Sequence, residues 1–169
     1  MSTPTFDRGR PGSLRRFFFR APLSLYRGAP AKVLASRCVM LLTTKGRRTG
    51  QERTTGVSFM PLEGTFIVFS GWGVRSDWYQ NLLANPEVTI QVGEKRLRAT
   101  AVPVADPARR RELMQQMRAR SGRCGPPEPV RTLLRKTGIF DYEGELDLAL
   151  RQGGELPVVK LVPQEGGAS

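Results

Sequence analysis

The sequence predicts a mainly β protein with inserted helices, built as a small closed or half-closed barrel of about six mostly antiparallel strands. Three observations point to this fold class. Short apolar, β-branched runs recur between residues 38 and 104. Most of them are separated by turns too short for a parallel crossover. The chain of 169 residues, 39% hydrophobic and 25% charged, is long enough and apolar enough for one domain with a core.

The predicted strands share β-branched and aromatic residues, and they span residues 38–44, 53–59, 65–70, 87–92, 95–104 and 156–162. The turn KGRRTGQ joins the first two into a hairpin. A second turn is expected at Pro61–Gly64. Gly93–Glu94 is a two-residue hairpin signal between the fourth and fifth strands. The last strand is expected to return to the same sheet.

Two helices are predicted between the strands. Residues 76–85 form the first, since Ser76 or Asp77 can cap its start and a proline follows its end. The second opens at Asp106–Pro107, because aspartate is a good N-cap and proline fits the first helical position, and it runs to Arg120. Its arginines are expected to form a solvated face.

The chain divides into three segments by composition. These are a disordered tail at 1–12, an amphipathic helical segment at 13–37, and a barrel domain at 38–164 with a helical insert at 106–151. The insert also contains weaker helical stretches at 130–136 and 143–151. In residues 13–30, aromatic residues alternate with arginines. This segment is interpreted either as a helix packed on the domain or as a basic, aromatic foot on an anionic membrane surface.

The net charge of +12 is concentrated near the start of the chain. Residues 1–61 hold 12 Lys/Arg and 2 Asp/Glu, a net of +10, whereas residues 62–105 hold 4 of each and residues 106–169 hold 11 and 9. Such asymmetry suggests a polyanionic partner: nucleic acid, anionic lipid or a phosphorylated cofactor.

The chain has no histidine and two cysteines. Cys38 lies in an apolar segment and is interpreted as a small core residue, and its spacing from Cys124 matches no metal motif. We therefore expect no metal site and a reduced, cytoplasmic compartment. No apolar run is long enough for a transmembrane helix, and no signal peptide is recognised.

The turn at 45–53 is the strongest candidate site. Arg47, Arg48 and Arg53 can donate bidentate hydrogen bonds to phosphate or carboxylate, and nearby threonines, among them Thr44, add hydroxyl donors. The alternative is a solvated hairpin tip. The GWGVRS loop at 71–76 does not qualify as a dinucleotide fingerprint, because its helix is short and a hairpin follows. Without histidine, an enzyme of this sequence needs a cofactor to supply the chemistry.

These residues carry a resemblance to a known family. LLTTKGRRTGQERTT (41–55), followed by a strand, a Gly-containing loop and DWYQNLLANPEVTIQVG (77–93), resembles the deazaflavin-dependent nitroreductase family, whose members share the split β-barrel fold of flavin-binding, pyridoxamine-phosphate-oxidase-like proteins. The blocks GRRTGQ and W-Y-x-N-L-x-A-N-P occur in the family's order and spacing. The resemblance covers roughly residues 39–104 and the last strand.

The resemblance implies binding of coenzyme F-420, an 8-hydroxy-5-deazaflavin whose tail carries a phosphate and glutamates. The basic turn would hold the tail, the following strand would line the ring, and the loop and short helix would close the pocket. The implied cofactor-binding residues are Arg47, Arg48, Thr49, Arg53, Thr54, Thr55, Gly56, Val57, Ser58, Ser70, Gly71, Trp72, Asp77, Trp78, Tyr79 and Asn81.

The implied reaction is hydride transfer from the reduced coenzyme to a small hydrophobic acceptor such as a quinone, a nitro compound or an activated alkene. Ser58 and Tyr79 are weak candidates for the proton donor. FMN or FAD is the alternative cofactor, since related split barrels use flavins. The family's tyrosine-rich substrate segment is missing and the 105–155 insert is longer, so the acceptor stays open.

Two other functions compete with a reductase. One is a non-catalytic deazaflavin or flavin carrier. The other is a nucleic-acid-binding module, disfavoured because the aromatic-basic segment and the basic turn lie on different elements. The expected protein is a monomer or homodimer in the cytoplasm, with the inner face of the membrane as a further location if residues 13–30 contact lipid.

Overall fold

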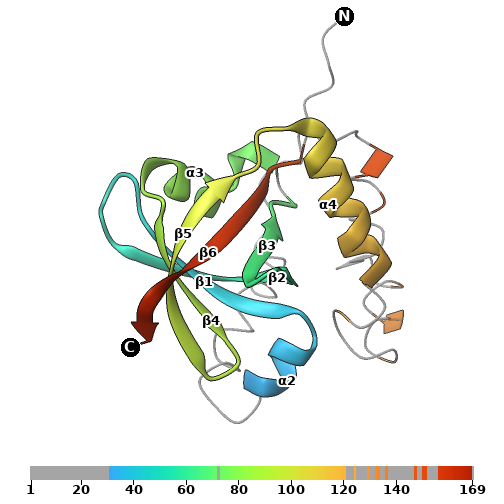
Figure 1. The fold of residues 1–169 in the computed structure, drawn as a ribbon, viewed down its shortest axis with the longest axis horizontal. Coiled ribbons are helices and arrows are strands. Elements are labelled where there is room, and N and C mark those ends of the chain that lie inside the picture. The colour runs from blue at the N-terminus through green and yellow to red at the C-terminus, as the bar shows by residue number, and fades with distance from the viewer. Residues whose placement is uncertain are drawn as a thin grey trace, which may run out of the picture.

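The computed structural model describes residues 31–71, 73–120, 124, 129, 132–133, 136, 147, 150–151 and 156–168. Six strands form a closed barrel in the order β1-β2-β3-β6-β5-β4, and every neighbouring pair is antiparallel (Figure 1). The strands are β1 (Val39–Lys45), β2 (Glu52–Leu62), β3 (Thr65–Phe69), β4 (Glu87–Val92), β5 (Lys95–Pro103) and β6 (Val158–Ala168). The predicted fold class is confirmed.

Inward-facing residues of all six strands form the first of two hydrophobic clusters. In β1 the pattern alternates, and Met40, Leu42 and Thr44 are almost completely buried. Besides Met40 and Leu42, this interior cluster contains the strand residues Val57, Phe59, Val68, Val88, Ile90, Ala99, Ala101, Val159 and Leu161, and one helical residue, Leu82. The apolar runs of the sequence therefore converge on the barrel axis.

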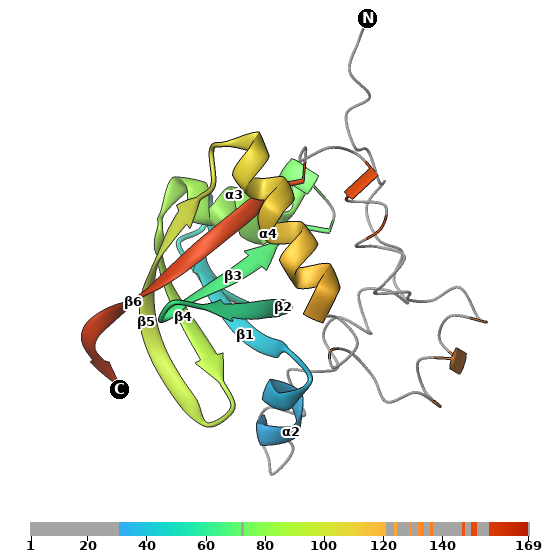
Figure 2. The ribbon, with the colours of Figure 1, turned by 45° about the vertical axis from the view of Figure 1, so that its right-hand side comes forward.

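Helix α4 (Pro107–Arg120) lies outside the barrel, beside β3 and β6, and forms a second cluster there (Figure 2). Its residues Leu113, Met114 and Met117 are 2% exposed and pack with Met60 and Ile67 of the barrel wall. Asp106 caps the helix as predicted: its Oδ1 accepts a 3.0 Å hydrogen bond from the backbone N–H of the second helical residue.

Two short helices lie at opposite ends of the barrel (Figures 1 and 2). Helix α2 (Ala31–Ser36) lies next to the β4–β5 hairpin, where Lys32 Nζ is 3.4 Å from Glu94 Oε2. Helix α3 (Asp77–Ala84), after the 3₁₀ turn η1 (Gly73–Arg75), covers the end where β1 stops, and its Leu82 belongs to the interior cluster.

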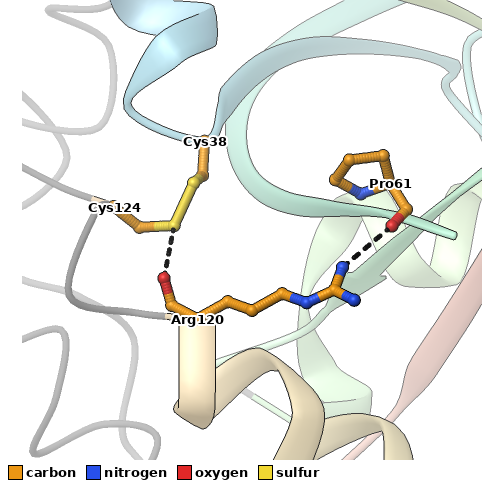
Figure 3. Close-up of a disulfide and its surroundings, with 4 residues drawn as sticks. All are labelled: Cys38, Pro61, Arg120 and Cys124. Carbon is orange, nitrogen blue, oxygen red and sulfur yellow. Dashed lines mark hydrogen bonds between the residues drawn. A yellow bond between two sulfur atoms is a disulfide. The ribbon is translucent and has the colours of Figure 1, made fainter.

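The interpretation of Cys38 as a small core residue was wrong. Cys38 and Cys124 form a disulfide that joins the start of β1 to the segment after α4 (Figure 3). Cys38 is half-buried, and its backbone is left-handed with φ of 61°. This conformation ends α2, because the Cys38 N–H turns back to donate to the Ala35 carbonyl at 3.1 Å. The two cysteines are 86 residues apart, so no local signal indicated the pairing.

Several boundaries differ from prediction. Pro61 belongs to β2, and the following turn is Glu63–Gly64, whose φ values of 50° and 76° match the two-residue hairpin turn that a twisted sheet prefers. Strand β6 continues to Ala168, which pairs with Leu97 of β5 beyond a register shift. Ser76 is the N-cap of α3, but its side chain makes no capping hydrogen bond.

Some predicted segments cannot be compared with the structure. Residues 1–30 lie outside the described part, and so do most of the weaker helical stretches at 130–136 and 143–151. Among the described residues, no helix is long and apolar enough to cross a membrane.

Candidate anion-binding site

The turn between β1 and β2 is closed by backbone hydrogen bonds and needs two glycines. The Gly46 N–H donates to the Gln51 carbonyl and the Gly50 N–H donates to the Gly46 carbonyl, both at 2.8 Å. Gly50 has φ of +69°, and a Cβ on Gly46 would lie 3.0 Å from Thr49 Oγ1 and 3.1 Å from the Gln51 carbonyl oxygen. The backbone of this turn is therefore tightly defined.

Helix α3 holds the turn through Arg47. The Arg47 backbone N–H donates to Asn81 Oδ1 at 3.2 Å, and Arg47 Nη1 donates to the same oxygen at 3.0 Å. Arg47 Nη1 and Nη2 also donate to Asp77 Oδ1 at 3.4 and 3.2 Å. The block W-Y-x-N thus meets the block GRRTGQ directly.

Asn81 is the buried centre of this contact. Its side-chain amide donates to Thr44 Oγ1 at 3.2 Å, and the two residues are 4% and 1% exposed. A buried amide must find partners for its polar atoms, and here both ends are used. The expectation that Thr44 is a surface donor for an anion is corrected, because Thr44 is buried against Asn81.

Three other cations of the turn lie open to solvent. Lys45, Arg48 and Arg53 are exposed, and among the described residues no carboxylate is within ion-pair distance of them. Arg47, in contrast, is 31% exposed at its side chain and already paired. The available positive charge at the tip is therefore that of the three exposed side chains.

Beside these cations, strand β2 has a backbone edge that no described strand covers. Strand β3 pairs with β2 only from Phe59 to Leu62, whereas β2 pairs with β1 from Glu52 to Ser58. The Phe59 N–H donates to the Cys38 carbonyl, so residues 53, 55 and 57 also bond toward β1 by alternation. The N–H and C=O groups of residues 52, 54 and 56 consequently point away from β1, toward the uncovered side, whereas residue 58 lies where the pairing with β3 begins.

Alternation also divides the predicted ring-lining residues between two faces. Thr54, Gly56 and Ser58 lie on the outer face, where Thr54 Oγ1 is 2.8 Å from Thr43 Oγ1. Thr55 and Val57 lie on the inner face opposite Leu42 and Met40, and Val57 belongs to the interior cluster. Among these predicted ring-lining residues, the side chains on the outer face are therefore those of Thr54 and Ser58, with Gly56 between them.

The remaining predicted residues are more scattered. Ser70 is fully buried and donates to the Gly73 carbonyl at 2.7 Å, which fixes the loop before α3. Trp78 and Tyr79 are partly buried, pack against the interior cluster and contact each other edge to face with ring centroids 6.2 Å apart. Gly71 is half-buried, Asp77 is exposed, and Trp72 lies outside the described residues.

The structure does not bring the two proposed proton donors together. Ser58 pairs with Val39 at the start of β1, whereas Tyr79 lies on α3 near the end of β1. Val39, the partner of Ser58, and Thr44, which Asn81 of α3 contacts, are five residues apart on β1, which corresponds to about 17 Å of strand. The uncovered edge of β2 was the feature that sequence reasoning missed, because strand length and pairing depend on distant neighbours.

Comparison with known proteins gives this geometry a context. The family of F420H(2)-dependent quinone reductases matches residues 19–124, more than half of the chain. Curated quinone reductases of that description from two strains of Mycobacterium tuberculosis are 36% identical over 109 residues, which is 57% of this chain and 73% of theirs.

A solved structure of an F420-H2 dependent reductase has a similar fold. It superposes with a TM-score of 0.51 at 21% identity and covers 74% of this chain and 94% of its own. At this identity the likeness concerns the fold alone. The residues matched by the family include both the basic turn and the W-Y-x-N helix that contact each other here, and on the strength of that match the chain belongs to the F420H(2)-dependent quinone reductase family.

Proposed function

We propose that this protein is an F-420-dependent oxidoreductase that reduces a small, hydrophobic, electron-poor acceptor, with quinones as the leading class and nitro compounds or activated alkenes as others. The observation that carries the proposal is the set of exposed cations at the β1–β2 turn beside the uncovered edge of β2. The family description names F420H(2), and nothing in it favours FMN or FAD.

The donor set suits the anionic tail of the coenzyme. Arg48 and Arg53 offer planar guanidinium groups that match phosphate and carboxylate geometry, and Lys45 adds a compact positive charge. None of the three has a described carboxylate partner to displace. We propose that they hold the phosphate and the first glutamates, with the Thr49 hydroxyl beside them.

The outer face and free edge of β2 suit a flat ring. Gly56 carries no side chain, so a planar group can approach the backbone closely, and the alternate N–H and C=O groups supply hydrogen-bond partners. We propose that Thr54, Gly56 and Ser58 line the ring, and that Gly71 approaches it from the loop. Val57 and Thr55 support the strand from inside the barrel.

The cofactor supplies the redox chemistry, and the protein positions the reactants. When bound, the reduced coenzyme supplies a hydride from C5, which with one proton converts a quinone to its hydroquinone and leaves the coenzyme oxidised. The protein orients the two reactants. Ser58 is the hydroxyl we propose as proton source, because it lies on the outer face of β2, whereas Tyr79 packs against the interior cluster.

Fluorescence titration with oxidised coenzyme F-420, beside FMN and FAD, tests the proposal. We expect binding of the deazaflavin and weak or no binding of the flavins. Substituting Arg48→Gln or Arg53→Gln removes a charge-assisted hydrogen bond, so affinity should fall roughly 10- to 100-fold. Lys95→Gln removes the same charge at the other end of the barrel and should leave affinity unchanged.

Turnover separates a reductase from a carrier. With reduced F-420 and menadione as a test quinone, a reductase oxidises the coenzyme repeatedly, whereas a carrier binds it without turnover. Tight F-420 binding without oxidation of the coenzyme by any of a quinone, a nitro compound and an activated alkene would favour the carrier. Tighter binding of FMN would overturn the cofactor assignment.

A further inference from the structure

The Arg47–Asp77 pair places a protein carboxylate on a guanidinium of the proposed anion site. Asp77 Oδ1 lies 3.2 Å from Arg47 Nη2 and 3.4 Å from Nη1, so one carboxylate oxygen is held by both terminal nitrogens. This is the arrangement that a phosphate oxygen would adopt on arginine. The carboxylate therefore occupies a position that an anionic ligand can also use.

The two partners of Arg47 differ sharply in burial. The Asp77 side chain is 89% exposed, whereas Asn81 is 4% exposed and accepts from both the Arg47 backbone and its guanidinium. An exposed ion pair contributes little free energy and is easily broken. A buried acceptor with a neutral amide holds the arginine in place without neutralising its charge. Release of Asp77 would thus leave Arg47 positioned and charged.

We propose that Asp77 is an affinity-setting residue: it occupies Arg47 when no anion is bound, and an anionic group of the coenzyme tail takes its place on binding. This inference rests on the proposed function and extends it. Asp77 then acts against binding of the tail, in contrast to its expected role of closing the pocket. Arg47 then becomes a fourth cation of the site, but only after the ligand has displaced Asp77.

The test compares two ligands that share the ring but differ in charge. Oxidised F-420 carries the phosphate and glutamates, and the same deazaflavin ring with only its ribityl chain carries neither. Asp77→Asn removes the competing charge, so binding of F-420 should tighten by up to about fivefold, the size of an exposed ion pair. Binding of the ribityl deazaflavin should not change. In turnover assays at constant ionic strength, KM for the reduced coenzyme should fall while kcat stays the same.

Glu94→Gln is the matched control. Glu94 is also an exposed carboxylate in an ion pair, with Lys32, but it lies at the opposite end of the barrel. Like Asp77→Asn, the substitution Glu94→Gln removes one negative charge, so any general electrostatic effect on F-420 binding should appear in both variants. Inorganic phosphate as competitor gives a second readout, and it should inhibit F-420 binding more strongly in Asp77→Asn than in the wild type.

The outcomes are distinguishable. Equal effects of Asp77→Asn on both ligands, no effect, or weaker F-420 binding would each refute the exchange, the last because Asp77 would then serve to hold Arg47. An equal gain in Glu94→Gln would also refute it. Failure of the wild type to bind F-420 at all would refute the proposed function, and this inference with it.

Discussion

Reduction of the Cys38–Cys124 disulfide should lower the stability of the barrel by a large and calculable amount. The bond closes a loop that contains five of the six strands and both α3 and α4. Reduction removes this constraint from the unfolded chain but leaves the folded contacts of both residues largely in place. The effect therefore acts mainly through the unfolded state.

The magnitude follows from the sequence separation of 86 residues. The chain-entropy relation gives a loss of about 15 cal/mol/K in the unfolded state, which corresponds to about 4.5 kcal/mol at 25 °C. Native disulfides usually contribute between about 2 and 5 kcal/mol, so the expected loss lies in that range. The left-handed backbone at Cys38 is common to the oxidised and reduced folded states and does not enter the difference.

Urea unfolding monitored by tryptophan fluorescence measures this difference directly. The oxidised protein, the protein with reductant, and a Cys38→Ser/Cys124→Ala double variant should be compared, with the double variant insensitive to reductant. Two free thiols in the untreated, unfolded protein would show that the bond is absent. A stability difference below about 1 kcal/mol on reduction would refute the entropic reasoning, since it lies well under the expected range.

Three further predictions concern packing, capping and pH. Leu82→Ala should lower the free energy of unfolding by about 2–5 kcal/mol, because Leu82 is 1% exposed in the barrel interior. Leu83 lies on the same helix but is 49% exposed, so Leu83→Ala should lower it by under about 1 kcal/mol. Urea unfolding of the two variants measures this difference. Asp106→Ala should cost about 1 kcal/mol through the lost cap of α4, and an unchanged unfolding curve would contradict the capping role. Arg118 lowers the pKa of Asp147 by donating a hydrogen bond at 2.8 Å to its carboxylate. The pair therefore stabilises the fold at pH values above the pKa that this carboxyl has in the unfolded chain. The stabilisation is lost as the pH falls through the lower pKa of Asp147 in the folded protein. NMR titration of Asp147 should show that pKa rise toward normal in Arg118→Gln.

Local signals accounted for much of the fold. The Gly93–Glu94 hairpin and the α4 start at Asp106–Pro107 are set by backbone chemistry within a few residues, and both occur as predicted. The β1–β2 hairpin followed in the same way, since its turn needs glycine at two positions. The resemblance to a family assigned the basic turn and the helix at 76–85 to one pocket, but it did not predict that they bond to each other.

Features decided by distant partners could not be predicted in this way. Strand β6 extends to Ala168 because Leu97 of β5 offers a partner there, and β2 continues through Pro61 because β3 pairs with it there. The hydrogen bonds of Asn81 to Arg47 and Thr44 cross more than 30 residues of sequence. Such pairings depend on three-dimensional proximity, which neither periodicity nor propensity reports.

The wall formed by β3 and the first half of β6 has hydrophobic contacts on both sides. Val68 and Val159 face the barrel interior, whereas Ile67 and Val158 face α4. Amides in this wall should exchange with solvent only on global unfolding, because any local opening there exposes two clusters at once. The turn at 45–51 contributes no residue to either cluster and is held by its own backbone hydrogen bonds and by Asn81 of α3. The wall that should exchange most slowly is thus separate from the turn at which we propose that an anionic ligand binds, so substitutions in the turn should leave the exchange of the wall amides unchanged.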